Sequence, residues 1–485
     1  MRTNVIVNML GTVLIYLGIS MLIPLAWAVY DSGKDINAFI ITIVLTIITG
    51  YIMRIITKSE YEISIKESFA FVTLTWILAA FFGSFPFLLS GVLENFFDAY
   101  FETMSGFTTT GASVFDGVED LPRGILMWRS LTQWLGGMGI IALFVALFPR
   151  IGVRGMHLLK AEVPGPVTEK VVPRVANTAK ILWKIYVSFS LLQLILLLLV
   201  GLTFFDALAH TFTTMPTGGF STQDLSVAGF QNPAAEMIVL FFMIIAGGNF
   251  AIYFSMVRGN YKSFLRNEEF RFYLMGLFAL ILIASFYLYI EEYQEVLQAF
   301  RYGSFQVVTM VTTTGFATAD YDIWAPFMRV MLFLLMFLGG CGGSTSGSIK
   351  QIRILTLFKH SIREIYKLIH PNAVLPIRLK GKVIKEEIVS GILGYVILYI
   401  LIFVVSSLLI SLTKVDFTTA LSAVAANIGN VGPGLGMVGP TENYAFFPSW
   451  AKMLLSILMV VGRLEIYTVI VLLLPEFRTF KKRSN

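Results

Sequence analysis

The sequence predicts an all-α polytopic membrane protein, and three observations lead to that prediction. Hydrophobic residues fill 56% of the 485 positions, with a mean hydropathy of +0.77, and charged residues only 14%. An average soluble protein has roughly 25% charged residues. Apolar windows of about 20 residues, the length that crosses a hydrocarbon core, recur along the chain. A short pattern rich in Gly and Thr returns between these windows.

Ten apolar segments are predicted to span the membrane. They lie at about 5–30, 37–57, 67–91, 125–149, 181–203, 234–257, 270–290, 325–350, 388–412 and 450–474. Four stretches between them are too short and too polar to span, at about 94–113, 206–222, 296–318 and 416–436. We expect each to enter as a half-helix and return as extended backbone, which is tolerated at membrane depth only when buried in protein or lining a watery cavity.

Basic residues set the predicted orientation. With the N-terminus in the cytoplasm, 28 of the 36 Lys and Arg residues fall in inner segments, as the positive-inside rule requires. Both termini are then cytoplasmic, and the half-helices enter from outside. The positive-inside topology explains the basic segments, so no nucleic-acid partner is expected. The basic segment 351–385 could also bind a cytosolic protein. The outer flanks are acidic, as at Asp98, Glu102 and Asp116, which either concentrates cations or only keeps the loops soluble.

The short pattern is an internal repeat, and it decides the predicted architecture. FFDAYFETMSGFTTTGAS (96–113) aligns without a gap with FFDALAHTFTTMPTGGFS (204–221), and FQVVTMVTTTGFAT (305–318) and ALSAVAANIGNVGPGLG (420–436) are further copies. The chain is therefore predicted to hold four non-identical helix–pore-loop–helix repeats with pseudo-fourfold symmetry around one pore. The expected units are an N-terminal transmembrane hairpin (1–60) and pore repeats at 61–150, 151–260, 261–360 and 361–485.

The composition of the loops predicts a K⁺ selectivity filter. Backbone carbonyls can replace the hydration shell of K⁺, and glycine most readily takes the dihedrals that turn carbonyls inward. No loop is a complete Thr-Val-Gly-Tyr-Gly filter, so fewer sites and looser selectivity are expected. The predicted K⁺-binding residues are Thr109, Thr110 and Gly111; Thr217, Gly218 and Gly219; Thr313, Thr314 and Gly315; and Asn430, Val431 and Gly432.

These loops resemble those of the Trk/Ktr/HKT superfamily of K⁺ transport proteins, and the resemblance covers the whole chain. The N-terminal hairpin and the motifs QWLGGMGI (133–140), AEVPGP (161–166), GGCGGSTSGSIK (339–350), NVGPGLG (430–436) and GRLEIYTV (462–469) are similar to the bacterial Trk subfamily, the membrane subunit of a potassium uptake system. The resemblance implies a homodimer in the bacterial inner membrane, with a cytosolic ring of Rossmann-type nucleotide-binding subunits. Pro216-Thr217 in the second loop departs from the family's pattern, at a position that varies in the family.

A second group of candidate functional residues lies at 339–347, where the last helix of the third repeat should continue. Glycines with hydroxyl residues break a helix there, and the sequence does not match a phosphate-binding loop. The segment is either close packing of small residues or, as the resemblance implies, a gate under the filter. The gate residues are Gly339, Gly340, Gly342, Gly343, Ser344, Thr345, Ser346 and Gly347, together with Arg463.

Arg463 lies in the last apolar segment, where a charge is costly and functional by default. The family resemblance implies that it lies near the pore and sets a positive barrier to ions; the alternative is that it pairs with Glu465 or with a loop. We treat it as the only basic residue near mid-depth in a pore-lining helix.

Rival functions can be weighed from the same residues. A Na⁺-permeable or cation-coupled relative of the same fold is the main alternative, and glycine in all four loops favours K⁺. An intramembrane enzyme would need converging carboxylates or histidines, whereas the four histidines are expected at helix ends or in loops. A scaffold would not need four glycine loops. We therefore expect K⁺ uptake, no enzyme activity, no bound cofactor besides the permeating ion, and nucleotide control only through a partner.

Overall fold

The computed structural model describes residues 2–57, 64–139, 175–379 and 382–475. Three predicted features lie outside these residues: the second part of the span 125–149, the motif at 161–166 and the basic tail at 478–483. The described chain is mostly helical, with a single two-stranded hairpin made of β1 (Arg378–Leu379) and β2 (Lys382–Val383). The prediction of an all-α polytopic protein is confirmed.

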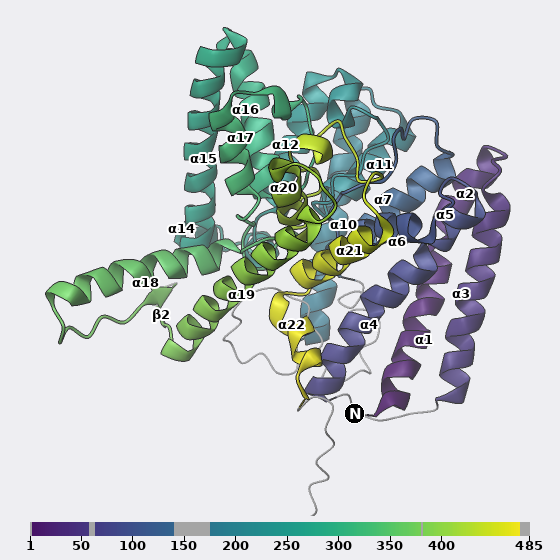
Figure 1. Ribbon diagram of the computed structural model, residues 1–485, viewed down its shortest axis with the longest axis horizontal. Coiled ribbons are helices and arrows are strands. Elements are labelled where there is room, and N and C mark those ends of the chain that lie inside the picture. Colours follow the sequence, from purple (N-terminus) through teal and green to yellow (C-terminus); the bar gives the residue numbers. More distant parts are fainter. Residues whose placement is uncertain (1, 58–63, 140–174, 380–381, 476–485) are drawn as a thin grey trace, which may run out of the picture.

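The N-terminal hairpin packs beside the rest of the molecule, at the right of Figure 1. It consists of α1 (Thr3–Ser20), α2 (Leu22–Tyr30) and α3 (Ile36–Ile56). A Cβ added at Gly11 or Gly50 would collide with the facing backbone carbonyl, so small residues let α1 and α3 approach closely.

Each repeat then supplies a first helix, a buried half-helix and a last helix (Figure 1). The first repeat has α4 (Ile65–Gly83), α5 (Phe85–Leu89), α6 (Phe96–Phe107) and α7 (Arg123–Gly137). The second has α10 (Val175–Leu199), α11 (Phe204–Thr214), η2 (Ser226–Phe230), α12 (Pro233–Ala246), α13 (Phe250–Val257) and α14 (Lys262–Arg266).

The third and fourth repeats follow the same order. The third has α15 (Glu268–Leu288), η3 (Tyr289–Tyr293), α16 (Val296–Val311), η4 (Tyr321–Ile323), α17 (Pro326–Leu335) and α18 (Gln351–Ile369). The fourth has α19 (Glu386–Ser411), α20 (Phe417–Ile428), η5 (Gly436–Val438), α21 (Ser449–Arg463), α22 (Ile466–Ile470) and η6 (Val471–Leu473).

The last helix of three repeats is broken, which corrects the predicted spans 234–257, 325–350 and 450–474. Among the described residues, six helices are long and apolar enough to cross a membrane, or up to eight if bent pairs count as one span. The chain bends by 94° between α12 and α13 and by 114° between α21 and the segment Ile466–Leu473. In the third repeat, irregular backbone separates α17 from α18. Glycines lie at all three breaks, and they weaken helices.

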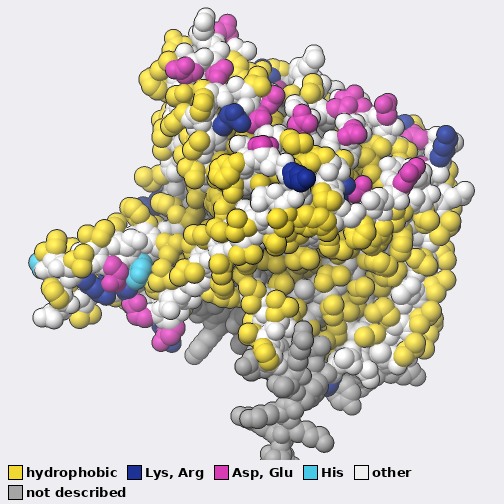
Figure 2. Space-filling view, viewed as in Figure 1, with side chains coloured by type: hydrophobic (Ala, Val, Ile, Leu, Met, Phe, Trp, Pro, Cys, Tyr) yellow, Lys and Arg dark blue, Asp and Glu magenta, His cyan; other side chains and the backbone are white. Residues whose placement is uncertain are grey.

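The half-helices form the centre, and one helix of the N-terminal hairpin and the first helices of the second, third and fourth repeats lie on the outside. The spans of α3, α10, α15 and α19 are only 22–28% buried and present apolar side chains outward, and Figure 2 shows the resulting hydrophobic belt. Asp and Glu side chains gather above this belt, whereas the N-terminus lies at the opposite end in Figure 1. A hydrophobic surface of this extent suits a lipid bilayer.

Candidate functional site

The four half-helices aim their C-terminal ends at one central region. Asn95, Thr203 and Asp416 cap the N-termini of α6, α11 and α20 with side-chain oxygens, which stabilises these short helices. The C-terminal end of a helix carries a partial negative charge, and half-helix ends of this kind attract cations. The arrangement therefore favours a cation where the helices end.

The loops after the half-helices share one backbone conformation. In each loop the first predicted residue has a positive φ, namely Thr109 (54°), Thr217 (58°), Thr313 (55°) and Asn430 (53°). The third, always glycine, has a positive φ between 80° and 100°. Alternating left-handed and extended residues turn successive carbonyls to the same side of the chain, so each loop can present a row of oxygens. The sequence indicated this geometry for the glycines but not for Thr and Asn.

Equivalent hydrogen bonds tie each loop to its own half-helix. The second residue of each loop donates its backbone N–H to a carbonyl five residues earlier: Thr110 to Ser105 (2.9 Å), Gly218 to Thr213 (2.9 Å), Thr314 to Thr309 (2.8 Å) and Val431 to Ala426 (2.8 Å). These four backbone N–H groups are therefore bound to the half-helices and point away from the common axis.

The loops meet in a closed ring. A Cβ added at each third-position glycine would lie closer than 3.0 Å to the second-position carbonyl oxygen of the next loop. The pairs run Gly111 to Gly218, Gly219 to Thr314, Gly315 to Val431 and Gly432 to Thr110. Since the last pair returns to the first loop, all twelve predicted filter residues surround one axis, and any side chain at these glycines would push a carbonyl out of place.

Side chains behind the ring hold it. The Thr108 and Thr110 hydroxyls are 2.8 Å apart, and Thr312 and Thr314 repeat this pair at 2.8 Å. Asn430 Nδ2 donates to Thr110 Oγ1 (2.9 Å) and to Met459 O (3.0 Å), which joins the fourth loop to the first. Buried hydrogen bonds of this kind fix a single geometry.

A buried ion pair supports the first two loops, and the sequence did not reveal it. Arg129 on α7 donates to Glu102 on α6 (2.7 Å), to Ser221 O (3.2 Å) and to Ser113 Oγ (3.2 Å), and its guanidinium lies 4.2 Å from the Phe220 ring. Glu102, predicted to flank the entrance, is therefore buried behind the loops. The partners are 27 residues apart, and nothing in the sequence pairs them.

His210 corrects another expectation. It lies inside α11, fully buried, and its two ring nitrogens contact Asp206 O (2.9 Å) and Ser221 Oγ (3.0 Å). It is thus part of the scaffold of the second loop and not at a helix end.

The predicted gate segment lies directly against the ring. Gly347 N donates to the Thr313 hydroxyl of the third loop (2.6 Å), and Thr345 Oγ1 donates to Met215 O (3.1 Å) and Ala246 O (3.2 Å). Gly339 and Gly340 approach the backbone of Gly347 and Gly247 too closely for a Cβ, and Gly343 has a φ of 84°. The segment 339–347 is therefore a tightly packed loop beside the ring.

Basic side chains hold this loop from two directions. Arg463 donates to Thr345 O (2.6 Å), Gly136 O (2.8 Å) and Gly137 O (2.9 Å), which links the fourth, third and first repeats. Lys350 Nζ donates to Ser346 O. Pairing of Arg463 with a loop is confirmed, whereas Glu465 forms its ion pair with Arg353.

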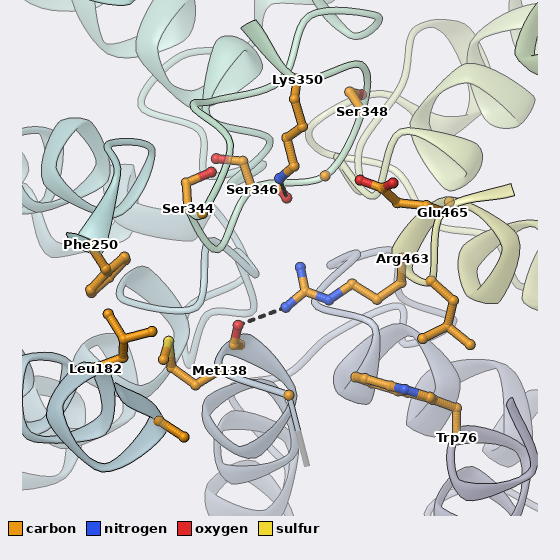
Figure 3. A pocket seen from close by; sticks show the side chains of 17 residues that line it. Trp76, Met138, Leu182, Phe250, Ser344, Ser346, Ser348, Lys350, Arg463 and Glu465 are labelled. Carbon is orange, nitrogen blue, oxygen red and sulfur yellow. Dashed lines mark hydrogen bonds between the residues drawn. The ribbon is translucent and has the colours of Figure 1, made fainter. Parts of the chain in front are cut away.

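Figure 3 shows a cavity of about 90 Å³ beside this loop. Arg463 reaches across it, and Lys350 points into it beside Ser346. Ser344, Glu465 and Trp76 are among the other residues that line it. Lys350 is 2% exposed, so Arg463 is not the only basic residue near this depth. The sequence assigned Lys350 to an inner segment because the preceding stretch was taken as a continuous helix.

The fold and the ring define a class: a multi-pass membrane protein whose four unequal repeats surround a cation-attracting axis. The model of the TrkH family, described as "Cation transport protein", matches residues 35–481. The chain belongs to this family. The predicted resemblance is thereby confirmed, and so is the prediction of a transport protein and not an enzyme.

Named relatives cover almost the entire chain. The Trk system potassium uptake protein TrkH of Escherichia coli strain K12 is 39% identical over 98% of this chain and 99% of its own. The TrkH of Halomonas elongata is 37% identical over 98% of this chain and 99% of its own. The TrkG of E. coli strain K12 is 35% identical over 97% of this chain and 98% of its own. The crystal structure of the potassium transporter TrkH from Vibrio parahaemolyticus matches with a TM-score of 0.90 at 35% identity, over 99% of this chain and all of that one.

Proposed function

We propose that this protein takes up K⁺ across the bacterial inner membrane through the ring of four loops. The closed ring of alternating φ signs carries the proposal, because it supplies carbonyl oxygens from four sides in place of water. The names of the relatives supply the ion, since they are potassium uptake proteins. An inside-negative potential drives entry by about 2.3 kcal/mol per elementary charge and 100 mV.

The orientation belongs to the same proposal. Both termini face the cytoplasm, because 28 of the 36 Lys and Arg residues then lie in inner segments. K⁺ meets the acidic outer face first, passes the loops, and reaches the segment 339–347. This segment with Arg463 acts as the gate. The buried Lys350 and the partly buried Arg463 support that role, since positive charge opposes the passage of K⁺.

Control comes from partners in this proposal. The protein works as a homodimer, and a cytosolic ring of Rossmann-type subunits binds nucleotide and moves the gate. The exposed apolar side of α18 supports a second copy as partner, and the basic stretch 351–385 supports docking of a cytosolic protein.

Ion flux in proteoliposomes tests the proposal. The purified protein should pass K⁺ and Rb⁺ much faster than Na⁺ under a fixed inside-negative potential. Equal K⁺ and Na⁺ flux would favour the alternative, a Na⁺-permeable relative. Uptake that requires a second cation gradient would favour a symporter. Empty liposomes and liposomes with the Gly315→Ser variant are the controls.

A further inference from the structure

The second filter loop lacks the side chains that hold two of the other loops. In the first and third loops, threonines on either side of the positive-φ residue join their hydroxyls at 2.8 Å. The same two positions in the second loop are Pro216 and Gly218, which have no hydroxyl. The second loop therefore needs another support if it is to keep the shared conformation.

Gln133 of the first repeat fills this gap. It lies on α7 and is fully buried. Its Nε2 donates to Gly218 O (2.8 Å), and its Oε1 accepts from Phe220 N (3.1 Å). The amide of Gln133 thus forms hydrogen bonds with the backbone on both sides of Gly219, the third residue of the loop.

The space that Gln133 occupies is the space of the missing side chain. A Cβ added at Gly218 would lie 2.8 Å from Gln133 Nε2 and closer still to Cδ and Oε1. A threonine at position 218 and a glutamine at position 133 therefore exclude each other. Position 218 is a glycine because the glutamine has taken its place, and not because its φ requires one, since Gly218 is outside the positive-φ set.

We propose that Gln133 is the positioning residue of the second filter loop, replacing the threonine pair of loops one and three and setting the K⁺ preference of this loop. The inference rests on the proposed function and deepens it. Gly218 O belongs to the closed ring, and a carbonyl has two lone pairs. One lone pair of Gly218 O accepts the hydrogen bond from Gln133 Nε2, and this bond directs the other lone pair toward the axis.

The first test removes the hydrogen bonds but keeps the shape. Gln133→Met should lower the K⁺/Na⁺ permeability ratio in proteoliposomes by roughly three- to tenfold, the effect of losing one or two buried hydrogen bonds. Gln193→Met is the matched control, because Gln193 is also fully buried in a spanning helix and its amide makes no hydrogen bond within the described chain. That variant should keep the ratio of the unaltered protein.

The second test rebuilds the threonine pair. Gly218→Thr alone should lose selectivity because its side chain meets Gln133. The triple variant Gln133→Ala, Pro216→Thr and Gly218→Thr should restore the ratio to within about twofold, since it copies loops one and three. A folded triple variant that stays unselective would overturn the inference, even if Gln133→Met fails to fold.

The inference and the proposed function fail in different ways. A selective unaltered protein with an unchanged ratio in folded Gln133→Met overturns the inference alone. An unaltered protein without K⁺ preference overturns the proposed function and the inference with it. Thermal unfolding of each detergent-purified variant shows which are folded.

Discussion

At the scale of single residues, the four loops of the ring carry strain on residues other than glycine. Thr109, Thr217 and Thr313 hold φ near 55°, a region that β-branched residues rarely occupy. Strain of this kind persists only where the surroundings impose it, and it often marks functional sites. Here the half-helix carbonyls and the neighbouring loops impose it. The conformation was not predictable from the sequence, because local preference argues against it.

The ring glycines lead to the first prediction. Gly315→Ser should lower the K⁺/Na⁺ permeability ratio at least about tenfold, because a Cβ there meets Val431 O and the φ of 83° disfavours it. Gly111→Ser should act in the same way against Gly218 O. Gly276→Ser is the control, because a Cβ at this helical glycine meets nothing within 4 Å. Unchanged ratios in folded ring variants would remove these glycines from the filter.

Arg463 leads to the second prediction. At about 6 Å and an effective dielectric constant of about 20, one unit charge raises the energy of K⁺ by about 3 kcal/mol, or roughly two decades in rate if the whole term lies in the barrier. Arg463→Ala should therefore speed K⁺ flux, most clearly at low salt. Arg463→Lys should stay closer to the unaltered protein, because it keeps the charge. The measurement is flux per folded protein. Slower flux in folded Arg463→Ala would mean that the hydrogen bonds of Arg463 to the first and third repeats matter more than its charge.

At the scale of elements, one hydrogen bond joins the segment 339–347, the proposed gate, to the third loop of the ring, the proposed filter. Gly347 N donates to the hydroxyl of Thr313 (2.6 Å). The equivalent hydroxyl of the first loop, on Thr109, is buried and has no hydrogen-bond partner in the described ranges. Thr109 and Thr313 therefore occupy equivalent positions, but only Thr313 bonds to the segment 339–347. Comparing substitutions at the two positions therefore separates an effect on the proposed gate from an effect on the proposed filter.

The third prediction uses that difference. Thr313→Val should free the gate segment and raise K⁺ flux by up to about fivefold, the effect of one hydrogen bond. Thr109→Val should leave flux nearly unchanged, since both variants keep a β-branched residue at the same φ. Single-channel or stopped-flow flux measurements compare the two. Equal changes in both variants would show that Thr313 does not link filter and gate.

Deletion of part of the gate segment gives the fourth prediction. Removing residues within 342–347 should raise flux, because the loop would no longer lie beneath the filter. The contacts of Thr345 with Met215 and Ala246 would be lost as well. Folded deletion variants that conduct no faster than the unaltered protein would make the segment a packing element and not a gate.

The elements also show how far the sequence could lead. The order of the repeats and the four Gly-rich loops followed from spacing, because each loop sits between two apolar windows. The breaks at Gly247–Gly248 and at Glu465 (φ 58°) did not, since hydropathy averages over the whole window. The contacts of Gln133 with Gly218 and of Arg129 with Glu102 were missed because 85 and 27 residues of sequence separate the partners, and no local pattern pairs them.

At the scale of the whole molecule, one chain closes its own ring. Asn430 of the fourth loop reaches Thr110 of the first across 320 residues of sequence. A single chain lets each loop carry its own support: threonine pairs in two loops, an asparagine in one and, as we propose, a glutamine in the remaining one. Because every copy contains all four loops, conduction should not require a second copy, whereas control by a partner can.

The last prediction separates conduction from assembly through α18. Phe358, Ile362, Ile365 and Ile369 recur at helical spacing and are 51–71% exposed, while Lys359, Arg363 and Lys367 lie on the other side. In Figure 1 this helix extends away from the body of the molecule. An exposed apolar face of this size favours association.

We therefore expect a dimer by light scattering in detergent, and a monomer for Ile362→Glu with Ile365→Glu, because two charges cannot be buried between copies without a large cost. Glu364→Gln, on the polar side, should remain a dimer. The monomeric variant should still conduct K⁺, since its ring is intact, but it should bind a soluble nucleotide-binding ring of subunits more weakly in a pull-down, because a symmetric ring contacts both copies. Loss of all flux in a folded monomer would show that the pore itself depends on the second copy, and a charged variant that stays dimeric would place the interface elsewhere.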